Sequence, residues 1–276
     1  MTDNAICQNF LQNASFEVTP KGAEKIDDFR EFLAPDTRVY VTFLPESDFA
    51  DTIKTVQKLQ AQGMTPVPHF AARSIPSKDF FETNLRDLTT NTSVREALLI
   101  GGGVDKPLGE FHESMQILQL GLFEKYGITQ LGVAGHPEGS PDITPDLVQK
   151  AIDEKNAYAQ SSRMQLYIAT QFCFEAAPII AWAESLAAKG NKLPIHIGVP
   201  GLATIKTLLK HAQHCGIGPS MKVLAAQAAN ITKLMITRTP DILVRELAEY
   251  QANTPSSPIR SVHMYPLGGL KKTVLW

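Results

Sequence analysis

The chain has few cysteines, no long apolar run and little net charge, and each shortage excludes a class of protein. Its three cysteines, Cys7, Cys173 and Cys215, lie far apart and form no CxxC pair. Such a sparse set argues against a disulfide framework or a zinc site and predicts a reducing, cytoplasmic location. No His/Asp/Glu cluster has metal-ligand spacing either, so we expect no metal.

Membranes and nucleic acids are also disfavoured as partners. The N-terminal stretch MTDNAICQNFLQN lacks both the basic region and the apolar region of a secretory signal. The longest apolar stretches, such as 176–183, are short and interrupted by proline, so none spans a bilayer. A formal net charge of −2 gives no electrostatic reason to expect nucleic acid or an anionic membrane.

What the chain does contain is a series of short, β-branched apolar runs, several of them almost continuously apolar. Such runs are typical of parallel strands that are covered on both faces. They predict strands at 14–18, 39–43, 65–70, 97–101, 130–135, 165–172, 195–199 and 261–265. Helical patterns lie between them, for example over 47–63, where Gly63 supplies a stop. Thr144-Pro145-Asp146 and Thr239-Pro240-Asp241 each predict an N-cap, a proline in the first position and an acidic first turn.

This alternation predicts an α/β fold, a (β/α)8 TIM barrel that forms a single domain over residues 1–276. The main alternative is a doubly wound open sheet, but the first strand carries no GxGxxG motif. Active sites of barrels lie at the C-terminal ends of the strands, so the last residues of each run are the candidates. Those ends contain Glu17, Thr42, His69, 101–103, 135–136, Gln171, Pro200 and 265–269.

Six short motifs at these strand ends occur in a characteristic order and spacing. They are Ser15-Phe16-Glu17, Val41-Thr42, Pro68-His69, the stretch GVAGHPEGSP at 132–141, Thr170-Gln171-Phe172 and His263-Met264-Tyr265. Together they resemble the motifs of the methylenetetrahydrofolate reductase family over nearly the whole chain. In that family the motif that corresponds to Thr170-Gln171-Phe172 is Thr-Gln-aromatic, and the one that corresponds to His263-Met264-Tyr265 is His-Phe-Tyr.

The resemblance implies an oxidoreductase that interconverts 5,10-methylenetetrahydrofolate and 5-methyltetrahydrofolate with NAD(P)H, with FAD bound in the barrel mouth. Glu17 matches the general acid of the family. Protonation of the imidazolidine nitrogen opens the ring to an electrophilic iminium, and a buried carboxyl group kept protonated near neutral pH can supply that proton. The alternative is that Glu17 pairs with a basic residue inside the barrel.

Gln171 matches the family's substrate amide, whose donor and acceptor can read the pterin edge. The alternative is a glutamine bonded to backbone at the rim of the core. The resemblance further implies cofactor contacts from Thr42, His69, Gly103, Ala134, His136 and Lys155. Taken alone, His69 favours a structural, hydrogen-bonded histidine, and the match at Lys155 needs an alignment shift across 158–163. His196 and Met264 are expected to belong to barrel packing.

Several residues near the expected flavin depart from the family. Its fourth strand ends in Leu-Arg-Gly-Asp, whereas this chain has Ile100 followed by Gly101–Gly103, so both charged side chains are missing. Consecutive glycines can also cradle a phosphate or make a tight turn, but no GK[ST] follows. The family's flavin-stacking tyrosine is His136 here and its histidine is Ser140. The expected arginine before Lys155 is Glu154, which would repel a pyrophosphate.

Three hypotheses follow. The first is a FAD-dependent reductase with a rearranged cofactor pocket. The second is a folate enzyme without flavin, in which the hydride passes directly from NAD(P)H. The third is a non-catalytic tetrahydrofolate-binding protein that serves methyl-transfer partners. The sequence leaves open the choice of NADH or NADPH, the direction of the reaction, polyglutamate preference and whether the chain forms a homo-oligomer.

Overall fold

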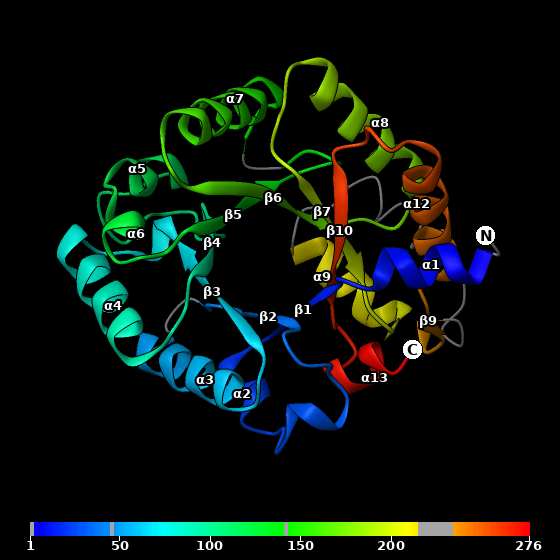
Figure 1. The fold of residues 1–276 in the computed structure, drawn as a ribbon, viewed down its shortest axis with the longest axis horizontal. Helices are drawn as coiled ribbons and strands as arrows, with labels where there is room; N and C mark the ends of the chain where they lie inside the picture. The colour runs from blue at the N-terminus through cyan, green and yellow to red at the C-terminus, as the bar shows by residue number, and fades with distance from the viewer. Residues whose placement is uncertain (1–2, 45–46, 141–142, 215–233) are drawn as a thin grey trace. The chain divides into compact units, whose positions relative to one another are not determined.

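A computed structural model describes residues 3–44, 47–140, 143–214 and 234–276 (Figure 1). Its strands are β1 (Ser15–Val18), β2 (Arg38–Val41), β3 (Thr65–Ala71), β4 (Glu96–Ile100), β5 (Gln130–Gly135), β6 (Gln165–Phe172), β7 (Ile195–Pro200), β8 (Ala203–Thr204), β9 (Thr237–Arg238) and β10 (Ile259–Tyr265). Its α-helices are α1 (Asp3–Leu11), α2 (Pro20–Ala23), α3 (Phe49–Ala61), α4 (Lys78–Asn91), α5 (Ser114–Gln119), α6 (Leu122–Lys125), α7 (Pro145–Ser161), α8 (Ala176–Ala188), α9 (Ile205–His214), α12 (Asp241–Asn253) and α13 (Leu270–Val274). Two 3-10 helices, η1 (Phe29–Glu31) and η2 (Ala72–Ser74), complete the order.

Eight strands form a closed parallel barrel in the order β1-β10-β7-β6-β5-β4-β3-β2, with helices between them. The prediction of a (β/α)8 barrel is therefore confirmed. Each of the eight expected runs became a strand of the barrel, with ends that differ from the prediction by two residues at most. The pair β8 and β9 forms a separate antiparallel sheet that the sequence pattern did not predict, because each strand has only two residues.

The chain divides into two compact units. Unit 1 comprises residues 1–16, 135–153 and 169–276, and unit 2 comprises residues 17–134 and 154–168. The single domain expected over 1–276 stays a prediction.

In unit 2, β3 lies between β2 and β4 and pairs with both, and β4 pairs with β5. Helix α3 packs on β3 and against α4, and both helices lie along the outside of these strands (Figure 1). The expected helix over 47–63 begins at Phe49, because the Asp48 carboxylate caps it by accepting the N–H of Ala50 at 2.9 Å. Gly63 ends it with a φ of 78°, as expected of a glycine stop.

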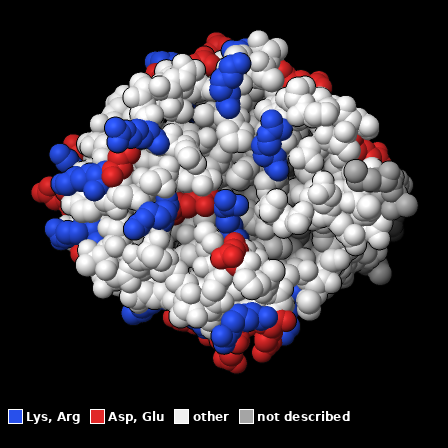
Figure 2. Space-filling view, viewed as in Figure 1, with Lys and Arg blue, Asp and Glu red and all other residues white. Residues whose placement is uncertain are grey.

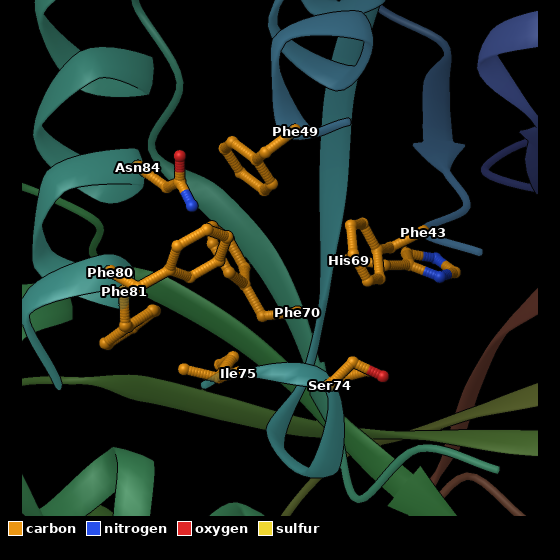
Figure 3. A pocket seen from close by; sticks show the side chains of 10 residues that line it. Phe43, Phe49, His69, Phe70, Ser74, Ile75, Phe80, Phe81 and Asn84 are labelled. Carbon is orange, nitrogen blue, oxygen red and sulfur yellow. The ribbon is translucent and has the colours of Figure 1, made fainter. Parts of the chain in front are cut away.

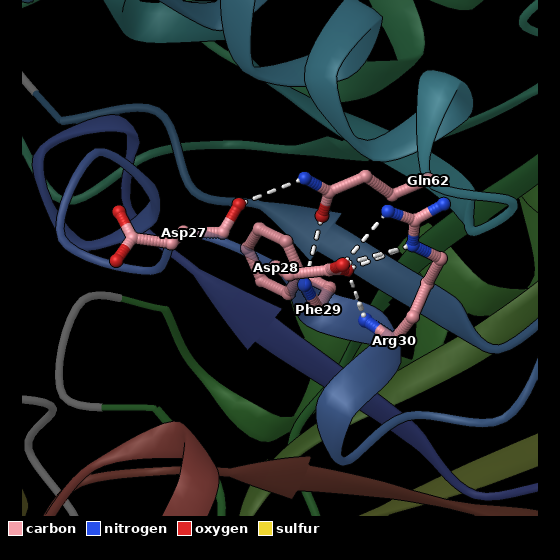
Figure 4. Close-up of polar contacts among 5 residues, drawn as sticks. All are labelled: Asp27, Asp28, Phe29, Arg30 and Gln62. Atoms are coloured by element: carbon pink, nitrogen blue, oxygen red, sulfur yellow. Dashed lines mark hydrogen bonds and ion pairs between the residues drawn. The ribbon is translucent and has the colours of Figure 1, made fainter.

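A side-chain contact fixes the loop between α2 and β2 to the end of α3 (Figure 4). The amide of Gln62 accepts the N–H of Phe29 at 2.8 Å and donates to the carbonyl of Asp27 at 2.9 Å. Asp28 caps η1 by accepting the N–H of Arg30 at 2.9 Å and also pairs with its guanidinium. This loop follows the strand that carries Glu17, so its anchoring defines the course of the chain from β1 to β2.

The barrel strands of unit 2 enclose polar side chains as well as apolar ones. The hydroxyls of Tyr40 and Tyr167 lie 2.5 Å apart, and both side chains are buried. Arg38 donates from Nε to the buried carboxylate of Glu96 at 2.9 Å. Burial raises the pKa of Tyr167 well above its ordinary value, and the nearby Tyr40 and Glu96 raise it further. Tyr167 therefore stays a neutral hydrogen-bonding phenol at physiological pH.

In unit 1, β10 lies between β1 and β7, and α12 packs against both α1 and α8 (Figure 1). Helix α7 begins at Pro145, as predicted. Helix α12 begins at Asp241 with Pro240 in the capping position, so the proline predicted at the first helical position stands one residue earlier. His196 and Met264 are buried, as expected of barrel packing.

Candidate functional site

The predicted acid and one predicted flavin contact are close in unit 2. Glu17 is the third residue of β1, and its side chain is half-buried. Thr42 directly follows β2, and its N–H donates to the carbonyl of Val18 at 3.0 Å. This bond ties the residue after the acid to the end of the neighbouring strand. The structure therefore brings Glu17 and Thr42 together at the carboxyl ends of β1 and β2.

His69 is buried near the end of β3 and contacts aromatic side chains. Its ring lies edge-on to Tyr40, with 5.7 Å between centroids and 82° between the planes. His69 also lines an apolar cavity of about 20 Å³, on the side of Phe43 and away from Phe80 and Phe81 (Figure 3). That volume holds about one water molecule. The histidine's role toward a flavin stays a prediction.

The first of the glycines that follow β4 accepts a main-chain hydrogen bond from an arginine that follows β3. Arg73 lies in η2, just after β3, and its N–H donates to the carbonyl of Gly101 at 2.9 Å. Gly102 has a φ of 91°, a conformation that favours glycine, and Gly103 is exposed. Arg73 was not among the residues predicted from the sequence, although a basic residue four positions after Pro68-His69, in a βα loop, is a signal that could have indicated it.

Ala134 and Lys155 occupy different kinds of position in unit 2. Ala134 is half-buried in β5, one residue from the strand's end. Lys155 is buried on α7 instead of following a strand. Burial lowers the pKa of Lys155, while the negative charges of Glu113 and Glu154 oppose that shift. Glu154, expected to repel a pyrophosphate, thus interacts with the charge of the adjacent lysine.

The Thr-Gln-aromatic motif of β6 is held in place by bonds within unit 1. The hydroxyl of Thr170 accepts the N–H of Gly198 at 2.8 Å, and its carbonyl accepts the Tyr265 hydroxyl at 2.9 Å. The side-chain oxygen of Gln171 accepts the N–H of Phe172 at 3.0 Å. The side-chain oxygen of Gln171 is therefore bonded to the backbone, as the alternative interpretation predicted. This bond orients the amide, whose NH2 group is a donor.

Gly198 explains how β7 passes so close to this motif. A Cβ at Gly198 would lie 2.5 Å from the carbonyl oxygen of Thr170 and 2.8 Å from the ring of Tyr265. Any side chain there would displace the Thr170 carbonyl or the tyrosine that binds it. A glycine is therefore required at position 198 for the hydrogen bonds that Thr170 makes beside Gln171.

Two of the quoted motifs meet directly in unit 1. Ser15 and His263 are paired across β1 and β10, and the serine Oγ lies 2.9 Å from the histidine Nδ1. His263 is buried, and its ring lies edge-on to that of Tyr265, with 4.7 Å between centroids. Ser15, two residues before the predicted acid, therefore contacts the histidine that packs against Tyr265 at the end of β10.

The loop after β5 that carries His136 also contacts the end of β6. Cys173 is buried, its thiol donates to the carbonyl of Gln171 at 3.7 Å, and the carboxylate of Glu138 lies near enough to interact with it. Both burial and the negative charge of Glu138 raise the pKa of this thiol. The contact brings the His136 loop next to the strand that carries Gln171. Glu138 was not among the predicted residues, although it lies inside the GVAGHPEGSP stretch.

Charge and metal-ligand patterns add no further site. On the face seen in Figure 2, lysine and arginine side chains lie among aspartates and glutamates. In the described ranges, no three His, Cys, Asp or Glu side chains gather in a way that could hold a metal ion. The helices of the same ranges are too short or too polar to cross a bilayer.

The fold class is thus a closed (β/α)8 barrel with polar side chains near the carboxyl ends of several strands. No protein-family model matches the chain. A solved structure with the same fold is an uncharacterized protein from Clostridium thermocellum that binds two copies of 5-methyl-5,6,7,8-tetrahydrofolic acid. The match has a TM-score of 0.54 at 10% identity and covers 99% of this chain and 96% of that one. A family GH18 chitinase from Chromobacterium violaceum matches with a TM-score of 0.46 at 10% identity, over 98% of this chain and 83% of that one.

Proposed function

We propose that the chain binds a reduced folate and interconverts 5,10-methylenetetrahydrofolate and 5-methyltetrahydrofolate with NAD(P)H. The observation that carries this proposal is the placement of Glu17 on β1 and Gln171 on β6, each near the carboxyl end of its strand. Active sites of (β/α)8 barrels are built at that end. The barrel from Clostridium thermocellum that binds 5-methyltetrahydrofolate adds support for a folate as ligand.

Glu17 would act as the acid in the reductive direction. Its carboxyl proton would pass to the imidazolidine nitrogen, the ring would open to the iminium, and a hydride would complete the methyl group. NAD(P)H is the source of that hydride, so the proton from Glu17 and the hydride together balance the reduction. In the oxidative direction Glu17 would take the proton back, because one transition state serves both directions.

Gln171 would orient the pterin. Its oxygen accepts the N–H of Phe172, which fixes the plane of the amide and leaves the NH2 group to donate to a ligand. Preorganised donors of this kind orient a substrate at little entropic cost, because the side chain is already held in one rotamer.

FAD is the cofactor that the resemblance implies, and it would relay the hydride from NAD(P)H to the folate. Residues of unit 2 would hold the phosphate-bearing part of such a dinucleotide. Arg73 stands over the end of β4, where the family's charged side chains are missing, and Gly103 has open space beside it. Thr42, His69, Ala134 and Lys155 of unit 2 would be further contacts, and the contact that the resemblance implies for His136 stays a prediction.

Replacing the acid tests the reductase proposal. We expect Glu17→Gln to slow folate reduction, or oxidation of 5-methyltetrahydrofolate, by about 10²–10⁴-fold, the usual contribution of positioned proton transfer. Any transfer from NADH to flavin should stay nearly unchanged, because that step needs no proton from Glu17. Stopped-flow absorbance separates the two steps, and Glu24→Gln, an exposed glutamate beside α2, is the matched control. Equal damage to both steps would contradict the assigned role.

The missing charges at Gly101–Gly103 favour a second candidate, a tetrahydrofolate-binding protein without redox activity. Purified protein distinguishes the candidates. A yellow protein that oxidises NADH with methylenetetrahydrofolate is a flavin-dependent reductase, and a colourless protein with that turnover transfers hydride directly. A colourless protein that binds 5-methyltetrahydrofolate and shows no turnover is the binding protein.

A further inference from the structure

A second cavity of unit 2 lies at the amino ends of β3, β4 and β5. Its volume is about 360 Å³, which falls within the range of small-molecule sites in proteins. We call it the amino-end cavity, and its polar lining includes Asp36, Gln60, Thr65, Glu96, Thr129 and Gln130. The residues of the proposed function lie near the carboxyl ends of strands, so this cavity is a different site.

The loops that precede β4 and β5 form two walls of this cavity, and hydrogen bonds fix both of them. The amide of Gln60 donates to the hydroxyl of Ser93 at 2.9 Å and accepts the N–H of the same serine at 3.2 Å. The N–H of Thr129 donates to the carbonyl of Arg95 at 2.8 Å. These bonds hold the walls in place without a ligand, which lowers the cost of binding one.

Glu96 supplies a buried carboxylate to the amino-end cavity. It is the first residue of β4, only 6% of it is exposed, and its Oε2 accepts the Nε–H of Arg38 at 2.9 Å. The carboxylate also raises the pKa of Tyr167, whose hydroxyl lies 2.5 Å from that of Tyr40. In the described part of the chain, Oε1 of Glu96 accepts no hydrogen bond. A buried carboxylate oxygen of this kind is costly, so Oε1 is where the cavity requires a donor.

Asp36 adds a second carboxylate at the exposed rim of the cavity. Its N–H donates to the carbonyl of Gly63 at 2.8 Å, which fixes its backbone at a φ of 61°. Within the described ranges its side chain takes part in no hydrogen bond or ion pair. The charge of Asp36 is therefore available to a ligand in the cavity.

Two arginines lie close to these carboxylates. Arg38 donates to Oε2 of Glu96 and thereby offsets the charge of that side chain. Arg95 lines the cavity, but its Nη1 lies 4.0 Å from the Cβ position of Gly127, a residue outside the lining. The guanidinium of Arg95 thus lies on the side of Gly127. With Glu96 offset by Arg38, the carboxylate of Asp36 leaves an excess of negative charge at the cavity.

An ammonium group suits these oxygens. It carries a positive charge and three N–H donors, and Thr65 and Gln130 offer further acceptors beside the two carboxylates. In the described ranges, no three His, Cys, Asp or Glu side chains gather in a way that could hold a metal ion. We infer that the amino-end cavity binds a small organic amine, whose ammonium group donates to Oε1 of Glu96 and is attracted by the charge of Asp36.

Calorimetric titration of the full chain tests this site. Low ionic strength is used, because salt screens the exposed Asp36. The amine probes are 1,4-diaminobutane and butylamine, and the neutral probe of similar length is 1,4-butanediol. We expect at least one amine to bind about tenfold or more tightly than the diol, because only an ammonium makes a charge-assisted hydrogen bond to Glu96. The two amines show whether one ammonium group or two are recognised.

Two variants remove one carboxylate charge each. Glu96→Gln should weaken the amine by about tenfold or more, and circular dichroism checks its fold, because Glu96 also binds Arg38. Asp36→Asn leaves that pair intact, and asparagine adopts a positive φ as aspartate does. We expect it to weaken the amine by about two- to fivefold, as for an exposed charge. Asp105→Asn, an exposed aspartate in the loop after β4, is the matched control and should bind the amine as wild type does.

A pair of variants at the rim tests the location of the amine. Thr129 lines the cavity and is exposed. Thr129→Lys places an ammonium group there, and Thr129→Met places a neutral chain of similar length. We expect the lysine variant to bind the amine at least about threefold more weakly than the methionine variant, because its charge opposes the ligand. Thermal unfolding midpoints of the two should agree.

Two results would overturn the inference. One is wild-type protein that binds the amines no more tightly than the diol. The other is an amine affinity that is unchanged in Asp36→Asn and equal in the Thr129 pair, and these variants decide if Glu96→Gln does not fold. Titration with 5-methyltetrahydrofolate runs in parallel. Amine binding without folate binding contradicts the proposed function alone, and folate binding without amine binding contradicts this site alone.

Discussion

The thiol of Cys173 combines deep burial with a neighbouring carboxylate. Both the burial and the charge of Glu138 raise its pKa, so the fraction present as thiolate is smaller than for an ordinary cysteine. The thiolate is the form that reacts with alkylating reagents. This residue is therefore expected to be chemically inert in the folded protein, although it follows the candidate site by two positions.

We expect iodoacetamide at pH 8 to modify Cys173 at least about tenfold more slowly than Cys7, because thiolate fraction and access set the rate. Cys7 is a suitable internal reference, because it is only half-buried. Mass spectrometry of the two peptides over time gives both rates in one sample. Denaturation in guanidinium should make the rates equal. Equal rates in the native protein would show that the thiol is neither buried nor beside Glu138 in solution.

At the scale of the elements, the passage of β5 beside Tyr167 depends on Gly132. A Cβ at this position would lie 2.7 Å from Cδ1 of Leu98 and 2.8 Å from Cζ and the hydroxyl of Tyr167. Tyr167 is held through its hydroxyl by Tyr40, so the ring cannot move without loss of that bond. The close packing of β5 against Leu98 and Tyr167 therefore requires a glycine at the first position of the GVAG motif.

Gly132→Ala should lower the free energy of unfolding by about 1–3 kcal/mol, the usual effect of overpacking a core. Urea unfolding followed by circular dichroism measures the change. Gly103→Ala is the matched control and should stay within about 0.5 kcal/mol of wild type, because a Cβ there meets no atom within 4 Å. If both alanine variants unfolded at the same urea concentration, the close contact at Gly132 would not exist in solution.

At the scale of the whole molecule, local patterns in the sequence were sufficient to predict the eight-stranded barrel. Apolar runs predict the eight barrel strands because each strand is buried on both faces, and capping residues place the start of α7. The pattern cannot show contacts between distant residues. Such contacts depend on which strands are neighbours in space. They include the contacts of Arg73 with Gly101, of Glu138 with Cys173 and of Ser15 with His263. The candidate site was therefore predictable as residues at strand ends, whereas the bonds that orient them were not.

Folate binding itself should stabilise the whole chain, because a ligand that binds the native state alone shifts unfolding by mass action. At a 5-methyltetrahydrofolate concentration 100 times its Kd, the gain is about 2.7 kcal/mol. For a chain of this size that corresponds to a rise of roughly 5–10 °C in Tm. Differential scanning fluorimetry measures the rise over a ligand series.

Gln171→Ala should abolish most of the shift in Tm, whereas Gln165→Ala should keep it, because Gln165 is exposed at the opposite end of the same strand. A shift of equal size in both variants would mean that the folate does not bind at the carboxyl end of β6, and the assignment of Gln171 to the pterin would then be wrong.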